Sequence, residues 1–251
     1  MSVAARNLVA VAAGAILVVG GWQLLVVAGD YPHFILPGPV LVAQRLVAAW
    51  ADGTLARHAA ATLSEVVLGF AAGAVVAFGA GYLLARSRLA GLVLSPYLVA
   101  AQSTPILALA PLIALWFGTG LLSKVVICAL IVFFPIAVST MVGFRTVDPG
   151  LVEVARALRA TPAQILRTVE LPAALPQIFG GIRVGVTLAI IGAVVAEWAG
   201  AEVGLGILIL TARGSFDIPL VFASLVTIAG LGVALYGLVV LTERLATGPR
   251  G

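Results

Sequence analysis

Long apolar segments recur along this chain and restrict its possible folds more than any other feature. A helix needs about 20 apolar residues to cross a hydrocarbon core of about 30 Å, and an isolated strand would leave its backbone unsatisfied in lipid. Apolar residues make up 62% of the chain and charged residues only 10%, with a mean hydropathy of +1.20. We therefore expect an all-α integral membrane protein in which residues 1–251 form one transmembrane domain. The six predicted transmembrane helices are 7–28, 62–85, 92–117, 123–143, 178–197 and 218–242.

The basic residues indicate how the chain lies in the membrane. Six spans would place both termini, the turn at 86–91 and the loop at 144–176 on one side. That side would carry most of the arginines: Arg6, Arg86, Arg88, Arg145, Arg156, Arg159, Arg167, Arg244 and Arg250, with Arg183 close by. By the positive-inside rule it is the cytoplasmic side of a multi-pass protein. The 14 basic residues are not clustered with aromatic residues, which argues against nucleic acid as a partner and leaves membrane lipid as the surroundings.

Two segments on the opposite side are predicted to contain further structure. Residues 29–61 open with turn signals and continue with apolar residues near helical spacing, which indicates a short amphipathic helix at the outer surface. Residues 198–217 include the run GLGILIL, which is too apolar for a solvated loop and should pack back against the bundle. His33 and His58 are isolated on this side, and we interpret both as plain surface residues.

Two prolines interrupt the third predicted span. Pro105 and Pro111 each remove a backbone donor, so this helix should be kinked or locally unwound and should face the interior of the bundle. Gln102, Ser103 and Thr104 add hydrogen-bonding groups at the same depth. They either line a translocation pathway or satisfy backbone groups that the proline frees, and both interpretations stay open.

Two acidic residues lie near the outer ends of predicted spans. Exposure of an ionisable group to lipid at the bilayer centre costs at least about 2.5 kcal/mol, so Glu65 and Glu197 are candidates for a pathway or a gate. Solvation by water at the outer interface is the alternative explanation for both.

The loop at 144–176 has the best-defined polar structure in the chain. Asp148 is a natural N-cap with Pro149 in the first helical position, which predicts a helix through about Arg159. Its apolar stripe consists of Leu151, Val154, Ala155 and Leu158. Such a stripe needs a cover, which could be the membrane surface, the spans of the same chain or a partner protein.

A second helix should follow directly. Thr161 and Gln164 form a Thr-x-x-Gln capping box around a proline. Pro172 should end this helix near Glu170, and Pro176 should keep the chain from continuing straight into the fifth span.

The segment Glu153–Pro172 resembles the signature loop of inner-membrane permease subunits of binding-protein-dependent ABC importers. The pattern in that family is Glu-Ala-Ala, three residues, Gly, nine residues, and Ile-x-Leu-Pro. The residues in register are Glu153, Ala155, Leu171 and Pro172, with Val154 at the middle Ala and Val169 at the Ile. Arg159 replaces the glycine, which would permit a left-handed turn. We therefore expect a different turn geometry here, with Ala160 taking the strain.

The resemblance extends over most of the chain, through LPGPVLVAQRLVAAW, TPILALAPLIALWFGTGLLSKV and LPAALPQIFGGIRVGVTLAIIGAVVAEWAGAEVGLGILIL. These stretches look like the branch of permeases for nitrate, sulfonates, taurine and vitamin precursors. Glu65 and the tail ARGSFDIPLVFASL favour pyrimidine precursors of the thiamine type or riboflavin.

The resemblance implies a type I ABC importer permease of the bacterial inner membrane, with six transmembrane helices and a cytoplasmic two-helix coupling loop. Leu151, Val154, Ala155 and Leu158 would form the buried contact with an ATPase, with Glu153 fixing the helix, Arg159 in the turn and Pro172 turning the chain back toward the membrane. The implied partners are a cytoplasmic ABC ATPase dimer, a second permease copy in a homodimer and an extracytoplasmic substrate-binding protein. ATP and Mg²⁺ would bind to the ATPase, and this chain would need no cofactor. The segment Gly118–Lys124 comes nearest to a nucleotide-binding loop but has the wrong spacing.

Two other classes of function remain as alternatives. A membrane-embedded enzyme should show paired catalytic carboxylates or a metal cluster at one depth, and neither Glu65 nor Glu197 sits beside a nucleophile or metal ligand in the sequence. An ion-coupled secondary transporter would fit the broken third span but would leave the capped loop unexplained.

Overall fold

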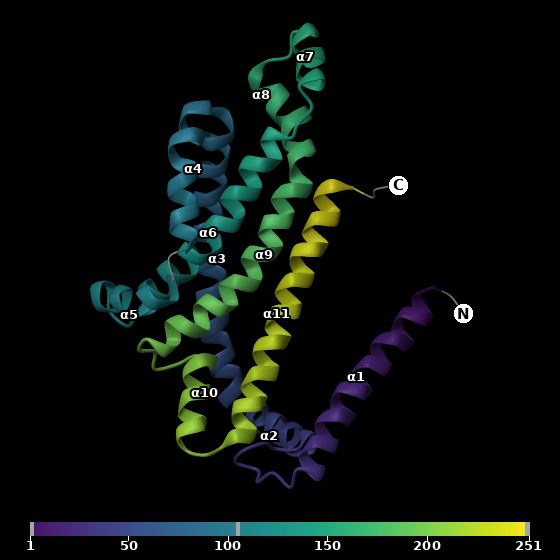
Figure 1. Cartoon of the computed structure of the whole chain (residues 1–251), viewed down its shortest axis with the longest axis vertical. Helices are drawn as coiled ribbons and strands as arrows, with labels where there is room; N and C mark the ends of the chain where they lie inside the picture. Colours follow the sequence, from purple (N-terminus) through teal and green to yellow (C-terminus); the bar gives the residue numbers. More distant parts are fainter. Residues whose placement is uncertain (1–2, 104–105, 249–251) are drawn as a thin grey trace.

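The computed structural model describes residues 3–103 and 106–248, and every regular element in these two ranges is a helix (Figure 1). The elements are α1 (Val3–Ala28), α2 (Pro39–Ala51), α3 (Thr54–Arg86), α4 (Arg88–Ser103), α5 (Ile106–Phe117), α6 (Leu121–Arg145), α7 (Pro149–Ala157), α8 (Pro162–Ile165), the π-helical turn η1 (Leu166–Glu170), α9 (Leu171–Trp198), α10 (Leu205–Gly214) and α11 (Ile218–Thr247). In Figure 1, α7 and α8 project from one end of the bundle, and α2 and α10 lie at the other. We call these the α7 end and the α10 end. Helix α1 leans away from the bundle.

Four helices in the described ranges are long and apolar enough to cross a membrane: Thr54–Arg86, Leu121–Arg145, Pro162–Trp198 and Ile218–Thr247. They contain the predicted spans 62–85, 123–143, 178–197 and 218–242. The predicted span 7–28 lies within α1, and the predicted span 92–117 is divided between α4 and α5. The number of six membrane crossings stays a prediction.

The third predicted span is not one helix. α4 ends at Ser103 and α5 begins at Ile106, and the two helices point in different directions (Figure 1). Each also has an internal proline, Pro96 in α4 and Pro111 in α5, which removes a backbone hydrogen bond. Of the pathway residues predicted here, the side chains of Gln102 and Ser103 and the whole of Thr104 lie outside the described part of the chain.

Helices α3, α6 and α9 form the centre of the bundle and approach one another through small side chains. Buried residues recur every fourth position: Glu65, Gly69, Gly73, Ala77 and Gly81 on α3, Lys124, Cys128, Val132, Ile136 and Thr140 on α6, and Gly181, Gly185, Ala189, Ala193 and Glu197 on α9. A Cβ atom on Gly73 would lie only 2.7 Å from the carbonyl oxygen of Ala129. Small residues at this spacing let helix backbones come together in lipid. At the α10 end each row finishes in an ionisable residue.

A separate apolar cluster closes the α10 end. It joins α2, the start of α3, α10 and the start of α11 through Ala49, Leu55, Ala59, Leu205, Leu208, Ala212, Leu220 and Ala223. Arg45 of α2 pairs with Asp217, which precedes α11, at 2.8 Å. The short helix predicted within 29–61 and the inward folding of 198–217 are confirmed.

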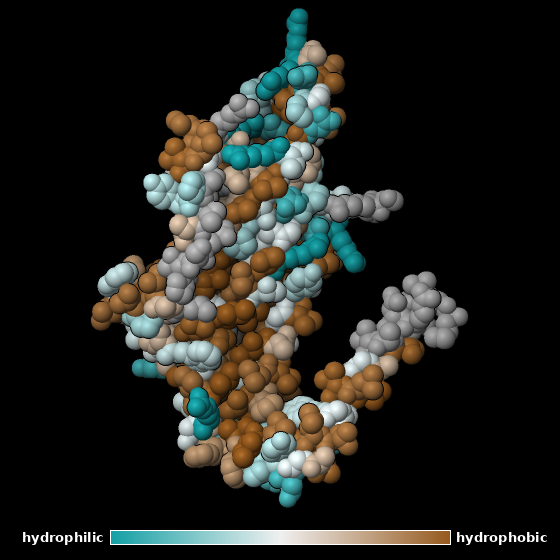
Figure 2. Space-filling view, viewed as in Figure 1, coloured by the Kyte–Doolittle hydropathy of each residue, from teal (hydrophilic) through white to brown (hydrophobic). Residues whose placement is uncertain are grey.

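The sides of the bundle are apolar at mid-height. Figure 2 shows hydrophobic side chains over the middle of the molecule and hydrophilic ones gathered toward the α7 end. Exposed aliphatic side chains on the long helices include Val75, Val76, Val233 and Leu238. An apolar belt between polar ends is the surface that a bilayer requires.

Candidate functional site: the α7 groove and the network around Glu197

The local signals that start α7 and α8 act as predicted. The Asp148 carboxylate accepts a hydrogen bond of 2.8 Å from the Gly150 amide, with Pro149 in the first turn. The Gln164 amide donates to the Thr161 hydroxyl at 3.3 Å, and the Thr161 amide donates to the Gln164 side chain at 2.8 Å. Both the N-cap and the capping box are confirmed.

The turn after α7 places Arg159 in the left-handed region, at a φ of 60°. The Ala160 amide donates to the Ala155 carbonyl at 3.0 Å, and the Arg159 amide donates to the Arg156 carbonyl at 2.9 Å. These two bonds define a Schellman motif with arginine in the position that glycine usually takes. The expectation that Ala160 takes the strain is therefore wrong. Left-handed geometry costs a residue with a Cβ roughly 1–2 kcal/mol, so Arg159 is strained.

The second helix of the loop does not end at Pro172. Residues Pro162–Trp198 form one continuous helix, because η1 leads directly into α9. In η1 the Leu171 amide reaches back five residues to the Leu166 carbonyl. This changed hydrogen-bond pattern leaves the proline in the first turn of α9, where its missing N–H does least harm. Pro176, expected to interrupt the chain, lies inside α9.

A groove lies between α7 and η1, with a volume of about 470 Å³. It is lined by Leu151, Val154, Ala155, Leu158, Ala160, Thr168 and Val169. Three of these side chains are largely exposed, Leu151 by 53%, Val154 by 61% and Leu158 by 79%. Contiguous apolar surface of this kind marks a binding surface in a soluble part of a protein. Glu153 is exposed on α7 and its side chain makes no hydrogen bond within the described ranges, so its proposed fixing role stays a prediction.

An ion pair joins the base of this loop to the bundle. The guanidinium of Arg86, at the end of α3, donates through both terminal nitrogens to the carboxylate of Glu170, the last residue of η1. Its Nε donates to the Tyr82 hydroxyl at 3.0 Å, and its Cζ lies 5.1 Å from the centroid of the Tyr82 ring. A bidentate pair fixes orientation as well as distance, so Arg86 holds the π-helical turn against α3.

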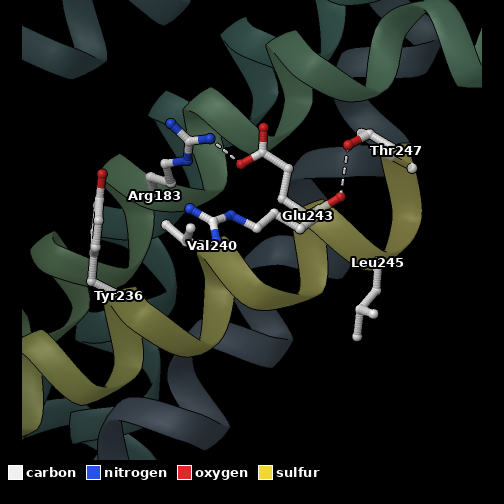
Figure 3. Close-up of a pocket in the computed structure, with 8 residues that line it drawn as sticks. Arg183, Tyr236, Val240, Glu243, Leu245 and Thr247 are labelled. Atoms are coloured by element: carbon white, nitrogen blue, oxygen red, sulfur yellow. Dashed lines mark hydrogen bonds and ion pairs between the residues drawn. The ribbon is translucent and has the colours of Figure 1, made fainter. Parts of the chain in front are cut away.

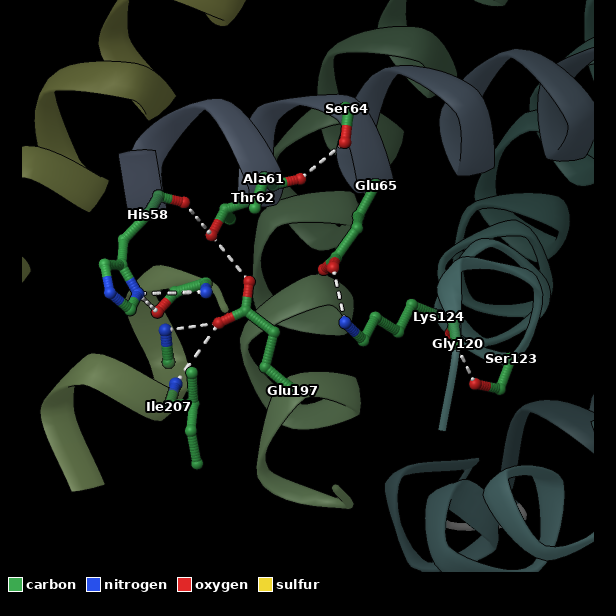
Figure 4. A network of polar contacts seen from close by, with 12 residues as sticks. His58, Ala61, Thr62, Ser64, Glu65, Gly120, Ser123, Lys124, Glu197 and Ile207 are labelled. Carbon is green, nitrogen blue, oxygen red and sulfur yellow. Dashed lines mark hydrogen bonds and ion pairs between the residues drawn. The ribbon is translucent and has the colours of Figure 1, made fainter. Parts of the chain in front are cut away.

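At the α10 end, side chains of α3 and α9 hydrogen-bond to the backbone that begins α10 (Figure 4). The Leu205 amide donates to the Thr62 hydroxyl at 2.8 Å, and the Gly206 and Ile207 (3.3 Å) amides donate to the Glu197 carboxylate. His58 Nδ1 lies 3.0 Å from the Gly204 amide and 2.7 Å from the Gly204 carbonyl oxygen, and its tautomer sets which of the two it bonds. The amides are ones that an α-helix leaves without a partner at its N-terminus. Helix α10 is therefore capped entirely by other helices.

Glu197 is the centre of this network. Its side chain is 0% exposed, and its other oxygen accepts a hydrogen bond of 2.5 Å from the Thr62 hydroxyl. Hydrogen bonds on both oxygens and the positive end of the α10 dipole offset the cost of burying a carboxylate. A Cβ on Gly204 would overlap this carboxylate. The oxygens of Glu197 are thus engaged with α10, and its pathway role stays a prediction.

Sequence reasoning missed two members of the network. His58 is half-buried and bonds to Gly204, so its interpretation as a plain surface residue is wrong. Thr62 was not singled out. Their partners lie 146 and 135 residues away along the chain, and no local signal indicates such contacts.

Two further ion pairs cross between helices. Glu65 of α3 pairs with Lys124 of α6 at 2.9 Å beside the Glu197 network, and both side chains are buried. The pathway role predicted for Glu65 likewise stays a prediction. Nearer the α7 end, Arg183 of α9 pairs with Glu243 of α11 (Figure 3). That pair lines an open hollow of about 750 Å³ with Tyr236 and the last turn of α11.

The comparisons with known proteins decide the family. Residues 69–247 match the family described as "Binding-protein-dependent transport system inner membrane component". The chain belongs to this family. The permease is 47% identical over 224 residues to the riboflavin transport system permease protein RibX of Chloroflexus aurantiacus, covering 89% of this chain and 84% of that one. It is 34% identical to the formylaminopyrimidine transport permease protein ThiX of Halalkalibacterium halodurans, covering 80% of each chain. It is 32% identical to the taurine transport system permease protein TauC of Escherichia coli, covering 92% and 86%.

The fold of the permease is that of solved ABC importers. The MetNI methionine ABC transporter in an inward-facing conformation matches with a TM-score of 0.66 at 23% identity, over 77% of this chain and 96% of that one. The sequence family identifies an inner-membrane permease subunit of a binding-protein-dependent ABC importer, and the fold agrees with it. Membership of this family implies an ATPase and a substrate-binding protein as partners. Its relatives are transport subunits and not enzymes, which sets aside the membrane-enzyme and secondary-transporter alternatives.

Proposed function

We propose that this permease forms a homodimer, docks a cytoplasmic ABC ATPase dimer on its α7 groove and imports a heterocyclic vitamin or vitamin precursor of the riboflavin or pyrimidine type. The ATPase would bind ATP and Mg²⁺, the binding protein would deliver the substrate on the outer side, and both termini of this chain would lie in the cytoplasm. The groove between α7 and η1 carries the docking proposal, because Leu151, Val154 and Leu158 stay largely exposed in the described part of the chain.

Charge supports the proposed orientation. Arg156, Arg159 and Arg167 are exposed around the groove, and Arg145 and Arg244 end two of the long helices on the same side. A concentration of arginine next to membrane spans favours the cytoplasmic side. An ATPase surface with apolar side chains and acidic neighbours would therefore complement the α7 end.

The docking proposal predicts that Ala155→Asp uncouples the transporter. Ala155 lines the groove, and a carboxylate there would be buried without a partner when the ATPase docks. Stimulation of ATP hydrolysis by the loaded binding protein should fall at least about tenfold, which corresponds to about 1.4 kcal/mol. The measurement is ATPase activity of the full transporter in proteoliposomes.

The chain offers a matched control for this variant. Ala157 lies on the same helix but is exposed and outside the groove, so Ala157→Asp should keep most of the stimulation. Normal stimulation in Ala155→Asp would contradict the docking proposal. An equal loss in both variants would attribute the effect to negative charge anywhere on α7.

The proposed substrate class rests on the similarity to RibX, at 47% identity over 89% of this chain. A sulfonate-type anion is the second candidate, because SsuC of Bacillus subtilis, named as an aliphatic sulfonates permease, is 36% identical over 91% of this chain. Uptake into proteoliposomes containing the ATPase and the binding protein should be measured with riboflavin, formylaminopyrimidine and taurine in parallel. ATP-dependent uptake of riboflavin or the pyrimidine supports the first candidate. Uptake of taurine alone would reject it.

A further inference from the structure

Helix α10 is capped at its C-terminus as well as at its N-terminus. The Asp217 amide donates to the Ala212 carbonyl at 2.9 Å, and the Phe216 amide donates to the Arg213 carbonyl at 3.1 Å, which is a second Schellman motif. The Asp217 side chain then caps α11 and pairs with Arg45 of α2. Four other helices therefore hold this short helix in place.

Phe216 is strained and exposed at this turn. Its φ is 60°, a left-handed conformation that is rare for a bulky residue and free of strain only for glycine. The side chain is 73% exposed and makes no ring or cation–π contact within the described ranges. Strain of this kind concentrates at functional sites, where the surrounding structure enforces it. The exposed ring is therefore available for a contact outside the described part of the chain.

The length of α11 places the turn beyond the hydrocarbon core when the Arg183–Glu243 pair lies at the opposite boundary. A helix rises about 1.5 Å per residue, so Ile218 and Glu243 are about 37 Å apart along α11. The hydrocarbon core is only about 30 Å thick. With the Arg183–Glu243 pair at one boundary, the Arg45–Asp217 pair and the neighbouring Phe216 lie beyond the other boundary.

Arg213 supplies charge beside the ring. It lies one turn before Phe216, is exposed, and its guanidinium has no partner in the part of the chain that the structure describes. A second permease copy in the same membrane would meet the long apolar sides of the bundle. The end of the bundle is instead accessible to a soluble protein.

We infer that Phe216 and Arg213 form a docking contact for the extracytoplasmic binding protein, which presents an apolar hollow to the ring and a carboxylate to the guanidinium. This inference rests on the proposed function, which places the α10 end on the outer side. On this inference the strain at Phe216 is retained because the binding protein contacts the ring. The caps at both ends of α10 hold the ring in a fixed position for that contact.

The test measures the affinity of the purified, substrate-loaded binding protein for the full transporter in lipid nanodiscs. Phe216→Gly removes the ring and the strain, whereas Phe216→Ala removes the ring and keeps most of the strain. Both variants should bind the binding protein about tenfold more weakly. Phe216→Gly should in addition unfold at a higher denaturant concentration than the unchanged protein.

Asp30→Gly is the matched control, because Asp30 also has a left-handed backbone, at a φ of 46°, and belongs to neither proposed docking surface. It should leave the affinity for the binding protein unchanged. Unchanged affinity in both Phe216 variants would overturn the inference and assign the ring to the lipid interface. Weaker binding in Phe216→Gly alone would also overturn it, since the backbone and not the ring would then be responsible. If the unchanged transporter fails to bind any binding protein, the proposed function itself fails.

Discussion

At the scale of single residues, Arg159 and Phe216 show the same departure from ordinary helix termination. Each occupies the left-handed position of a Schellman motif, and both are exposed. The chain contains 28 glycines, yet glycine does not occupy the left-handed position of either turn. One turn lies at each end of the bundle, next to the surfaces proposed for the two soluble partners.

Replacement of Arg159 by glycine should stabilise α7. The left-handed residue costs roughly 1–2 kcal/mol, and the greater flexibility of glycine in the unfolded chain offsets part of the gain. We expect local opening of α7 to become less favourable by about 0.5–1 kcal/mol, measured as slower amide hydrogen exchange in nanodiscs. Arg156→Gly, in the helical part of α7, should have the opposite effect by about 1 kcal/mol. Faster exchange in Arg159→Gly would mean that its side chain stabilises the turn.

The sequence predicts the residues that act on their neighbours. Asp148 and Thr161 cap helices through bonds spanning two or three residues, and both predictions are confirmed. The role of Glu197 as a cap for α10 depends on the way α3, α9 and α10 meet, which no short segment encodes. Pro172 failed as a helix stop because a π-helical turn of five residues precedes it, and residue preferences do not predict such a turn.

At the scale of helices, the contacts among α3, α6 and α9 depend on glycine and alanine, which leave room for the backbones to approach. The rows of glycine and alanine on α3 and α9 let both helices approach α6 at close range. Long apolar segments predicted that these helices exist, and the four long helices contain the corresponding predicted segments. Which faces touch is set by small residues at intervals of four, a pattern that hydropathy alone does not reveal.

Gly73→Ala should therefore destabilise the bundle. Its Cβ would lie 2.7 Å from the Ala129 carbonyl oxygen, so the backbones must move apart, at a cost of about 1–3 kcal/mol. Gly79→Ala on the same helix meets nothing within 4 Å and should be neutral or slightly stabilising. The stability of the two purified variants is compared by unfolding each in a denaturing detergent. Equal stability of both variants would show that α3 and α6 can separate without loss.

At the scale of the whole molecule, the interhelical ion pairs lie toward the two ends of the bundle. Arg86–Glu170 and Arg183–Glu243 lie toward the α7 end, and Glu65–Lys124 and Arg45–Asp217 toward the α10 end. An ion pair in lipid needs near-complete hydrogen bonding, which the polar ends supply and the apolar middle does not. The arrangement leaves the middle of the bundle free of paired charge and suited to the bilayer.

The continuous helix Pro162–Trp198 connects the two ends of the bundle. It is 37 residues long, so it extends about 55 Å, from the proposed ATPase groove to the carboxylate that caps α10. If a helix of this length tilts by about 10°, one end moves by about 10 Å relative to the other. Because Arg86 holds this helix near one end and Glu197 caps α10 at the other, a displacement at the proposed ATPase groove would reach α10 along one continuous helix.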